Sequence, residues 1–315
     1  MTGGASYDLA VSLDWEYDWD FIRLLEEEAG RLGLTTRTIP PAEVSELLAE
    51  FRADRFDFRV LLDRASPSAP DFVALQASAL ERGRDVIDPL EKLRWASDKA
   101  TMHLELIAHG IHTPYTLILP SCQSEEEPRL GPIELAPLGS PFVVKPANTT
   151  GGSLGVVADA RALEDALAAR RTYPADKYLL QEKIYPENRD GRRFWFRGFY
   201  ILGEVHCAWW DDRTHVYAEL VEDETEKYGL QALAGIVRSV AAVSRLRFFS
   251  TEIVRDVRGR LVSVDYVNEN CDMRLRSKHA DGVPDALVRK IASRIASYVA
   301  EAGAAAAGPS EPPGG

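Results

Sequence analysis

The sequence predicts an α/β fold for the N-terminal third of the chain and an α+β arrangement for the rest. Apolar, strand-like runs alternate with helical patterns over roughly residues 1–95, which is typical of a parallel sheet covered by helices. Beyond that region, strand-like runs follow one another directly, as they do in hairpins. The chain has 315 residues, which is long for a single core, so two or three packed units are expected.

The elements of the first unit follow from the spacing of its apolar residues. Phe21, Leu24 and Leu25 have the rhythm of an amphipathic helix, and Pro40 with Pro41 marks the start of a second helix. The run FDFRVLLD (56–63) has the length and composition of a buried strand. Strands are therefore expected over 7–14, 34–38, 56–63 and 84–88, and helices over 16–32, 41–52 and 69–82.

The second part opens with a helix expected over 96–110, with Ser97 or Asp98 as its N-cap and Gly110 as its end. Residues 121–140 are rich in Glu, Pro and Gly and are expected to form an irregular connection, and the tail 303–315 is expected to be disordered. The remaining strands are expected over 112–120, 141–147, 177–184, 192–202, 204–212, 248–256 and 260–268, and the remaining helices over 162–171, 228–244 and 285–302.

Composition narrows the class of protein. The net charge of −12 argues against a nucleic-acid partner, because phosphate backbones are bound by basic surfaces. No run approaches 18 apolar residues, and no basic segment followed by an apolar run stands at the N-terminus, so neither a membrane span nor a secretory signal is expected. Cys122, Cys207 and Cys271 fit no zinc spacing and no disulfide framework. A reducing cytoplasm is the simplest location.

Lys145 is the first candidate for chemistry. It ends the apolar strand VVKPA, where burial of its ammonium group is costly without an anionic partner such as a polyphosphate. The following turn, NTTGGSLG (148–155), has three glycines and three hydroxyl groups, which let backbone and side-chain donors approach phosphate oxygens. A flexible hairpin turn beside a surface lysine is the alternative interpretation.

Two carboxylates interrupt strands that are otherwise apolar. Glu252 lies in FFSTEIV and Asp265 in LVSVDYV, and the two strands are expected to pair as a hairpin. Buried carboxylates need a cation or strong hydrogen-bond partners, and magnesium prefers a few carboxylates together with phosphates and water. Asn268 and Asn270 offer neutral oxygen ligands nearby. Alternatively, both carboxylates face solvent on the outer side of the hairpin.

Weaker signals lie around these two features. The strand LLQEKI offers backbone groups and the Glu182 carboxylate to a purine edge, although such a strand is equally suited to a solvated surface. The run CDMRLRSKHADG (271–282) is either a basic surface turn or an anion site, because arginine grips carboxylates bidentately. Trp209 and Trp210 are expected to be one core and one exposed aromatic residue, and the exposed one would be suited to substrate contact.

The order of these motifs resembles the ATP-grasp superfamily. A helix beginning SDK is followed by VKP with a glycine loop, a QEKI hinge strand, an arginine-bearing strand and a carboxylate hairpin that ends in asparagine. The resemblance covers about residues 96–276, and the preceding α/β unit resembles the domain that usually precedes an ATP-grasp fold. It implies a parallel α/β domain over 1–95, a two-lobed ATP-grasp fold with its small lobe over 96–180 and its C-terminal lobe over 181–302, and a disordered tail over 303–315.

The resemblance also implies roles for individual residues in binding ATP and Mg²⁺, with Mn²⁺ as a possible substitute. The phosphate-contacting residues would be Lys99 and Lys145, beneath a lid formed by Gly151, Gly152, Ser153 and Gly155. The adenine hinge would comprise Gln181, Glu182, Lys183 and Ile184, with Asp190 or Glu187 at the ribose. The metal ligands would be Glu252, Asp265 and either Asn268 or Asn270, and Arg197 would steady a phosphate or an acyl intermediate.

One departure from the family pattern concerns the metal hairpin. Many ligases of this fold have a Glu-x-Asn sequence at this point, whereas here the carboxylate is Asp265 and no asparagine stands two places after it. A β-bulge would bring Asn268 round to the same face, or Asn270 would serve instead.

The resemblance implies a ligase that activates a carboxylate as an acylphosphate for attack by an amine, releasing ADP. Its substrates would be a small carboxylate and a small amine, held in part by Arg213, Arg274 and Lys278. A kinase that phosphorylates a polyol, as inositol phosphate kinases of this superfamily do, is the alternative, and a nucleotide-binding module without catalysis is a third. Dimers are common in this superfamily, so a homodimer is a possible assembly.

Overall fold

The computed structural model describes residues 4–123, 130–148 and 154–307 of the chain. Its N-terminal part is a four-stranded sheet of order β2-β1-β3-β4 in which every pairing is parallel, and this confirms the predicted α/β unit. The elements are β1 (Ala5–Ser12), η1 (Glu16–Asp18), α1 (Trp19–Arg31), β2 (Thr36–Ile39), η2 (Pro41–Glu43), α2 (Val44–Arg52), β3 (Phe56–Asp63), α3 (Asp71–Glu81) and β4 (Asp85–Ile87).

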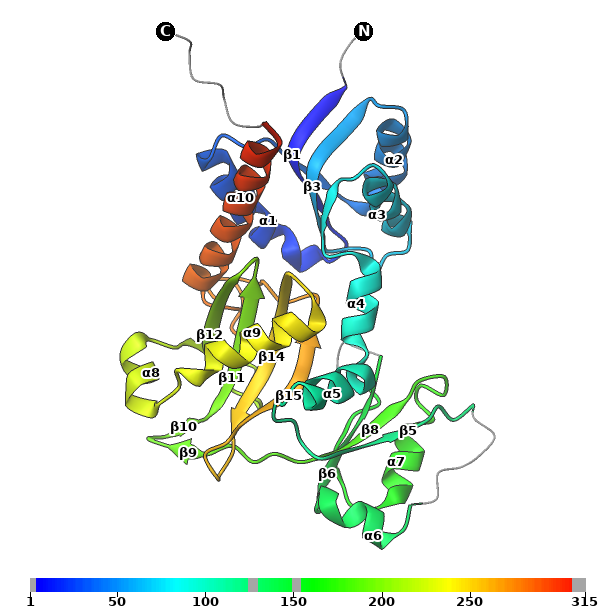
Figure 1. Cartoon of the computed structure of the whole chain (residues 1–315), viewed down its shortest axis with the longest axis vertical. Coiled ribbons are helices and arrows are strands. Elements are labelled where there is room, and N and C mark those ends of the chain that lie inside the picture. The colour runs from blue at the N-terminus through cyan, green and yellow to red at the C-terminus, as the bar shows by residue number, and fades with distance from the viewer. Residues whose placement is uncertain (1–3, 124–129, 149–153, 308–315) are drawn as a thin grey trace.

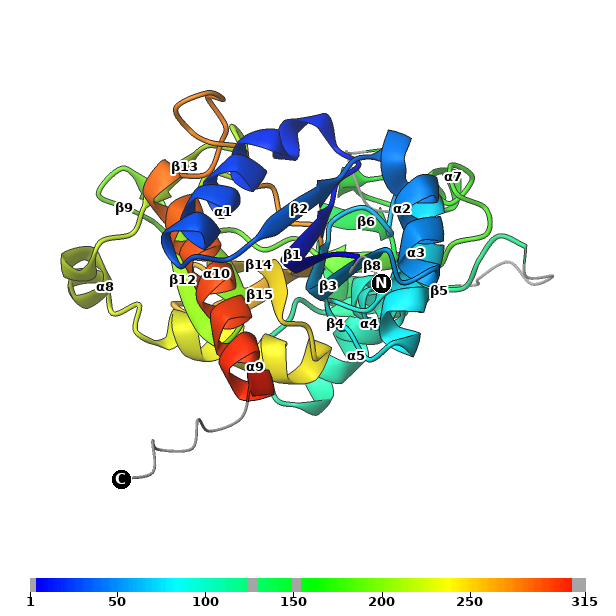
Figure 2. The ribbon, with the colours of Figure 1, turned by 90° about the horizontal axis from the view of Figure 1, so that it is seen from above.

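Helices cover both faces of this parallel sheet (Figures 1 and 2). On one face, Phe51 of α2 and Leu75 of α3 pack with Phe58 of β3 in one buried cluster. On the other face, α1 packs together with α10 (Asp285–Ala307), the last helix of the chain. The C-terminal helix therefore completes the core of the N-terminal sheet, although it is separated from it by most of the sequence.

The helix expected over 96–110 is α5 (Lys99–Ala108), with Asp98 as its N-cap, and a further helix that was not predicted, α4 (Leu90–Ser97), precedes it. Asp98 separates them in an extended conformation, and its side chain accepts hydrogen bonds from the backbone N–H groups of Ala100 and Thr101, each at 3.0 Å. An N-cap of this kind begins a new helix rather than extending the previous one. Lys99 is the first residue of α5, so the Asp98 cap fixes the position from which the Lys99 side chain projects.

A second, antiparallel sheet has the order β5-β8-β6-β7. Its strands are β5 (Thr116–Leu119), β6 (Phe142–Pro146), β7 (Val157–Ala160) and β8 (Tyr178–Glu182), and the helices beside it are α6 (Pro132–Leu135), η3 (Ala136–Leu138) and α7 (Leu163–Ala169). The helical turns α6 and η3 occupy part of the segment that was expected to be irregular. Lys145 lies on the central strand β6, close to its carboxyl end.

The third sheet is also antiparallel and has the order β13-β12-β11-β14-β15. Its strands are β11 (Trp195–Ile201), β12 (Glu204–Trp210), β13 (Tyr217–Glu219), β14 (Phe248–Arg255) and β15 (Leu261–Asn268), and the accompanying elements are β9 (Asn188–Arg189), β10 (Arg192–Arg193), α8 (Glu222–Tyr228) and α9 (Ala232–Ser244). Helix α9 covers one face of this sheet, where Val237 packs with Phe196 and Ile253. The opposite face is directed toward the first and second sheets (Figure 1).

The prediction that disorder begins at residue 303 is wrong for residues 303–307. Helix α10 runs from Asp285 to Ala307 and so includes the first alanines of the tail. Alanine has the highest helix propensity of all residues, which favours continuation of the helix until Gly308 and Pro309 interrupt the alanine run. Residues 308–315 lie outside the described part. Within that part, no helix combines the length and apolar character that crossing a bilayer requires.

Candidate functional site

Three charged side chains stand side by side across neighbouring strands of the third sheet. Arg197 on β11 pairs in register with Glu252 on β14, and Glu252 pairs with Asp265 on β15. Because directly paired residues project from the same face of a sheet, these three residues form a row, called here the charged row. The row lies on the face opposite α9, because the alternate residues Phe196 and Ile253 pack against that helix.

Within the charged row, the carboxylates have different surroundings. Glu252 Oε1 is 2.8 Å from Arg197 Nη2, and its Oε2 accepts a hydrogen bond from Trp195 Nε1 at 3.0 Å. Asp265 Oδ1, by contrast, is inaccessible to solvent and has no hydrogen-bond partner among the described residues. Glu252 is thus held by the protein, whereas Asp265 keeps an oxygen available to a further group.

The pairing of β14 with β15 is irregular beside the charged row. Asn268 pairs with Ser250 and Asp265 pairs with Glu252, so three steps along β15 correspond to two along β14. Such a bulge changes the alternation of faces, and it puts Asn268 on the same face as Asp265. Asn270 lies beyond the end of β15, in a bend. That Asn268 is the third metal ligand stays a prediction. The observed pairing of β14 with β15 has the bulge that this prediction requires.

Lys145 approaches the charged row from the second sheet. Its Nζ donates to the carbonyl of Val264 at 2.9 Å and lies 4.0 Å from Asp265 Oδ1. The side chain is 12% exposed. Lys99 is tethered nearby, because its backbone N–H donates to the carbonyl of Ala147, two residues after Lys145. Two lysines and the charged row therefore meet where the second and third sheets face each other.

The charges of this site shift one another's pKa values. Burial lowers the pKa of Lys145, and the nearby Lys99 lowers it further, against the opposing attraction of Asp265. Burial raises the pKa of Asp265, but three neighbouring cations outweigh burial and hold that pKa below its ordinary value. These cations are Lys99, Lys145 and Arg197. At neutral pH the site therefore contains an ionised carboxylate among cations, an arrangement suited to a metal–polyphosphate complex.

An apolar cluster adjoins the charged row at the hairpin. Ile184, which follows β8, and Trp195 pack against three valines of β14 and β15. These valines are Val254, Val262 and Val264. The predicted hinge segment therefore contacts the predicted metal hairpin through apolar side chains.

The other predicted hinge residues have contacts of their own. The Gln181 side chain is buried and donates to the Tyr266 hydroxyl at 2.8 Å, so it points beneath the site and not toward a ligand. Glu182 Oε2 accepts from the backbone N–H of Tyr115 at 3.2 Å, and Lys183 forms an ion pair of 2.6 Å with Asp159.

The two ribose candidates belong to the β9–β10 hairpin and the residue before it. Asp190 occupies its turn with φ +54° and contacts Lys227 at 2.9 Å, at the end of α8. Glu187 pairs with Arg255 at 2.8 Å, which places it beside β14. Glu187 is thus attached to the strand that carries Glu252, whereas Asp190 contacts Lys227 and Tyr228 of α8.

The predicted substrate residues are spread over two loops. Arg213 is 67% exposed and lies 3.8 Å from Asp211. Arg274 is bonded to both Asp272 and Asp281, and the charge of both carboxylates raises the pKa of Arg274. Lys278 pairs with Asp20 of α1. Of the predicted lid, Gly155 adopts φ +77°, and Gly151, Gly152 and Ser153 lie outside the described residues.

Two residues that border the site, Trp195 and Glu269, were not predicted from the sequence. Trp195 donates to Glu252, and Trp210, one of the two tryptophans considered for substrate contact, lies under the Arg197 guanidinium at 4.8 Å while stacking on His215 at 5.3 Å. Glu269 lies close to Lys99 and Asp265, and burial raises its pKa. Its position just after the apolar run LVSVDYV was the sequence signal for it. The described residues contain no group of three or more His, Cys, Asp or Glu side chains arranged to hold a metal.

Neither a protein-family model nor a curated protein matches the sequence. Solved structures do match the fold. A RimK-domain ATP-grasp protein from Sphaerobacter thermophilus is 20% identical with a TM-score of 0.61, covering 92% of this chain and 98% of that one. The D-cycloserine synthetase DcsG is 17% identical with a TM-score of 0.60, covering 94% and 100%. D-alanine–D-alanine ligase from Bacillus anthracis, solved with ATP, is 13% identical with a TM-score of 0.61, covering 95% and 97%.

These structures and the three sheets define the class of the protein: the chain has the ATP-grasp fold. Within that class, it has the version in which a parallel α/β unit precedes the two antiparallel sheets, and the similarity extends over both parts. The predicted fold class is thereby confirmed.

Proposed function

We propose that this protein is an ATP- and magnesium-dependent ligase that activates a carboxylate as an acylphosphate, which an amine then attacks to form an amide or peptide bond with release of ADP. The observation that carries the proposal is the meeting of Lys145 with the charged row across two sheets. The approach of Lys145 Nζ to 4.0 Å from Asp265 Oδ1 brings a buried cation beside an ionised carboxylate. Phosphoryl transfer depends mainly on such positioned charges, and not on a protein nucleophile.

The side chains present fit a metal–nucleotide complex. Asp265 Oδ1 is buried without a hydrogen-bond partner among the described residues, which is costly unless a cation or donor satisfies it. Asp265, Glu252 and Asn268 would supply the oxygen ligands, and a bound Mg²⁺ would neutralise charge on the phosphates. Similar folds have been solved with these groups: the ATP-grasp ligase PsnB, 12% identical with a TM-score of 0.61, was complexed with a minimal precursor, Mg and ADP.

The protein's own cations would bind the phosphates and the transferred group. Lys99 and Lys145 would hold the phosphates, and Arg197 would steady the transferred group, since it already faces Glu252 and Trp210. The stacked rings of Trp210 and His215 would bound the substrate side of the site. Arg213 is the most exposed of the predicted substrate cations, and it would contact the carboxylate substrate together with Arg274 and Lys278.

The experiment is a measurement of ADP formation by the purified chain with ATP, Mg²⁺ or Mn²⁺, and a panel of amino acids and small carboxylates, followed by product mass. We expect ADP release to need both a carboxylate and an amine. Lys145→Ala and Asp265→Asn should each reduce turnover about 100-fold or more, the usual effect of removing one preorganised charge from a transition state. Lys92→Ala is the matched control, because Lys92 is an exposed residue of α4.

Other outcomes would redirect or end the proposal. ADP release with a hydroxylated acceptor and no amine would identify a kinase, and tight ATP binding without turnover on any acceptor would identify a nucleotide-binding module. Wild-type rates in both Lys145→Ala and Asp265→Asn would show that the site itself is wrongly assigned.

A further inference from the structure

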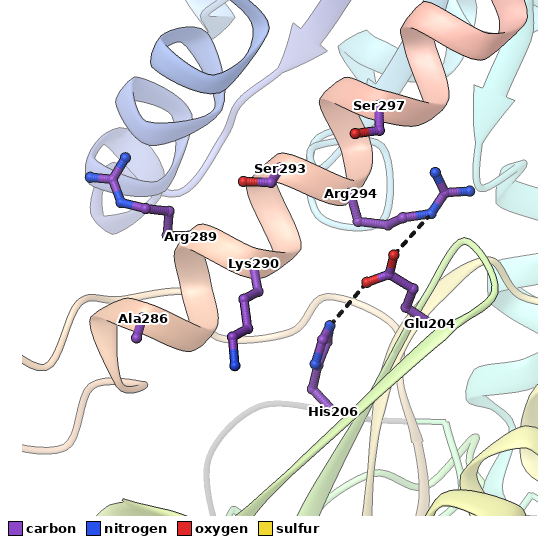
Figure 3. Close-up of a pocket in the computed structure, with 8 residues that line it drawn as sticks. All are labelled: Glu204, His206, Ala286, Arg289, Lys290, Ser293, Arg294 and Ser297. Atoms are coloured by element: carbon purple, nitrogen blue, oxygen red, sulfur yellow. Dashed lines mark ion pairs between the residues drawn. The ribbon is translucent and has the colours of Figure 1, made fainter. Parts of the chain in front are cut away.

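Two adjoining cavities lie between β12 and α10, outside the charged row. The larger has a volume of about 600 Å³ and the smaller about 190 Å³, and both are lined by His206 of β12 and Lys290 of α10. Figure 3 shows the larger one, with α10 above the strand and Lys290 extending from the helix on the side of His206. We call the two cavities together the β12–α10 groove.

One wall of the groove is a sheet edge without a partner strand. On its outer side, β12 pairs with β13 only from Ala208 to Trp210. No described residue pairs with the remaining outer edge, Glu204–Cys207. Four consecutive residues, 205–208, line the smaller cavity, so the edge of the strand and not merely one face borders the groove.

The register identifies which backbone groups are open. A two-residue turn, Leu202–Gly203, joins β11 to β12, so Ile201 and Glu204 form the hydrogen-bonded pair that closes the hairpin. Because hydrogen-bonded and non-bonded pairs alternate, Val205 and Cys207 direct their N–H and C=O groups away from β11. The pairing of Ala208 with Glu219 engages the Cys207 carbonyl, but no described backbone group bonds to the N–H and C=O of Val205 or to the N–H of Cys207. These open groups are a template for another strand.

The opposite wall comes from one stripe of α10. Ala286, Lys290, Ser293 and Ser297 follow one another at helical spacing along the larger cavity. The flanking arginines are already paired, Arg289 with Glu28 at 2.7 Å and Arg294 with Glu301 at 2.9 Å. Lys290 is exposed and forms no ion pair or hydrogen bond with any described residue. The groove thus combines open backbone groups with one uncompensated cation.

We propose that the β12–α10 groove binds an extended peptide as an added strand on β12, with an acidic side chain of the peptide opposite Lys290. Strand addition satisfies the N–H and C=O of Val205 and the N–H of Cys207, and α10 supplies the charge that selects the sequence. A second copy of this chain is a poorer occupant, because a two-fold contact would bring the same cations of both copies to one interface. This binding is separate from the proposed nucleotide site.

The test is a fluorescence-anisotropy titration of the full chain against a labelled, acetylated hexapeptide of alternating valine and glutamate. Saturable binding is expected. The same peptide with N-methylated backbone positions should bind about tenfold more weakly or worse, as should a version with lysine in place of glutamate. Both comparisons use the unaltered protein, so they do not depend on the folding of any variant.

Variants of the groove provide the second half of the test. Val205→Pro removes an outward N–H, which an edge strand tolerates, and should weaken binding about tenfold, whereas Val205→Thr retains the N–H and should bind normally. Lys290→Glu should weaken binding, and Lys92→Glu, the same charge change on α4, should not. Lys145→Ala should bind the peptide normally, which separates this proposal from the nucleotide site.

Several results would overturn the proposal. These are an absence of saturable binding, equal affinity for the N-methylated peptide, or unchanged binding by both Val205→Pro and Lys290→Glu. A concentration-dependent dimer in sedimentation that Val205→Pro dissociates would show that a second copy, and not a peptide, occupies the groove.

Discussion

The Tyr266 hydroxyl is the centre of a buried hydrogen-bond group beneath Lys145. His103 Nδ1 lies 2.7 Å from it, and Gln181 Nε2 donates to it at 2.8 Å. These contacts join α5, the second sheet and the third sheet at one atom, immediately after Asp265 in the chain. The Tyr266 ring faces Lys145 Nζ, 5.6 Å from the ring centre. Tyr266 is not itself a predicted binding residue, but it helps to position two residues that are, Lys145 and Asp265.

We expect Tyr266→Phe to lower the free energy of unfolding by about 1–3 kcal/mol, because it removes the hydrogen-bond partner of the buried His103 Nδ1 and leaves Gln181 Nε2 with only its bond to Thr116 among the described residues. Urea denaturation monitored by circular dichroism measures the change. Tyr200→Phe is the matched control: it removes the same hydroxyl from the third sheet, where the structure gives that hydroxyl no hydrogen bond among the described residues. Equal losses in the two variants would contradict this account.

His103 should make stability depend on pH. Burial lowers its pKa from the ordinary 6.5 to about 4, and the charge of Lys145 contributes. His103 therefore takes up a proton near pH 6.5 in the unfolded chain but only near pH 4 in the folded chain. The contribution of neutral His103 to stability is therefore full above pH 6.5 and is lost as the pH falls from 6.5 to about 4. The loss is on the order of 3 kcal/mol. Unfolding free energies from pH 7 to pH 4 should show this decline, and His103→Asn should flatten it.

The strands that carry the site were predictable, but their registers were not. Apolar runs ending in Lys145 and containing Glu252 and Asp265 are long enough to fix β6, β14 and β15. The irregular pairing that aligns Asn268 with Ser250 depends on contacts across strands, which residue spacing along one strand does not encode. From the sequence, a bulge that brings Asn268 to the site was only one of two possibilities, the other being that Asn270 serves instead.

Short polar elements were missed for a different physical reason. The segment EDETEKY forms α8, yet it has one buried residue, Tyr228, and so shows no apolar periodicity. Similarly, no hairpin was predicted over 186–193, although Asp190-Gly191 is a hairpin-turn pair and both residues have positive φ. In such segments tertiary packing and turn residues determine the structure, and the hydrophobic pattern does not predict it.

Packing of α9 on the third sheet depends on the absence of a side chain at Gly198. A Cβ there would lie 2.4 Å from Val237 Cγ2, which is too close for any contact. Gly198→Ala should therefore lower the unfolding free energy by about 1–3 kcal/mol through overpacking. Gly235→Ala, on α9 itself, meets no atom within 4 Å and should be neutral or stabilising by up to about 1 kcal/mol. Thermal denaturation of the two variants should give shifts of opposite sign; a stable Gly198→Ala protein would contradict the packing argument.

The overall arrangement joins segments that the sequence keeps far apart. The parallel unit was predictable from its alternating pattern, but nothing in the pattern of 285–302 shows that α10 packs against α1 near the start of the chain. That contact is a property of the folded core, in which Ile291 and Ile295 lie with Leu9 and Val11. The domain boundaries at residues 95, 180 and 302 stay predictions.

A buried ion pair connects the N-terminal unit to the loop that follows β15. Arg64 bonds to both Asp18 oxygens at 2.7 Å and donates to the Cys271 carbonyl at 2.9 Å. Both side chains are almost wholly inaccessible, at 2% and 0% exposure. Burial lowers the pKa of Arg64, but the charge of Asp18 outweighs burial and raises that pKa above its ordinary value. Arg64 therefore stays charged and depends on its partner.

Asp18→Asn should lower the unfolding free energy by about 3–5 kcal/mol, because it leaves the Arg64 charge buried and uncompensated. Asp54→Asn is the matched control: its ion pair with Arg82 is also 2.7 Å long, but the Asp54 side chain is 83% exposed, so water replaces the lost partner and about 0–1 kcal/mol is expected. Urea denaturation measures both. Because Arg64 also holds Cys271, Asp18→Asn should further reduce ADP formation at temperatures where the variant is still folded. Equal losses of unfolding free energy in Asp18→Asn and Asp54→Asn would show that the Arg64–Asp18 pair does not stabilise the contact between the N-terminal unit and the loop after β15.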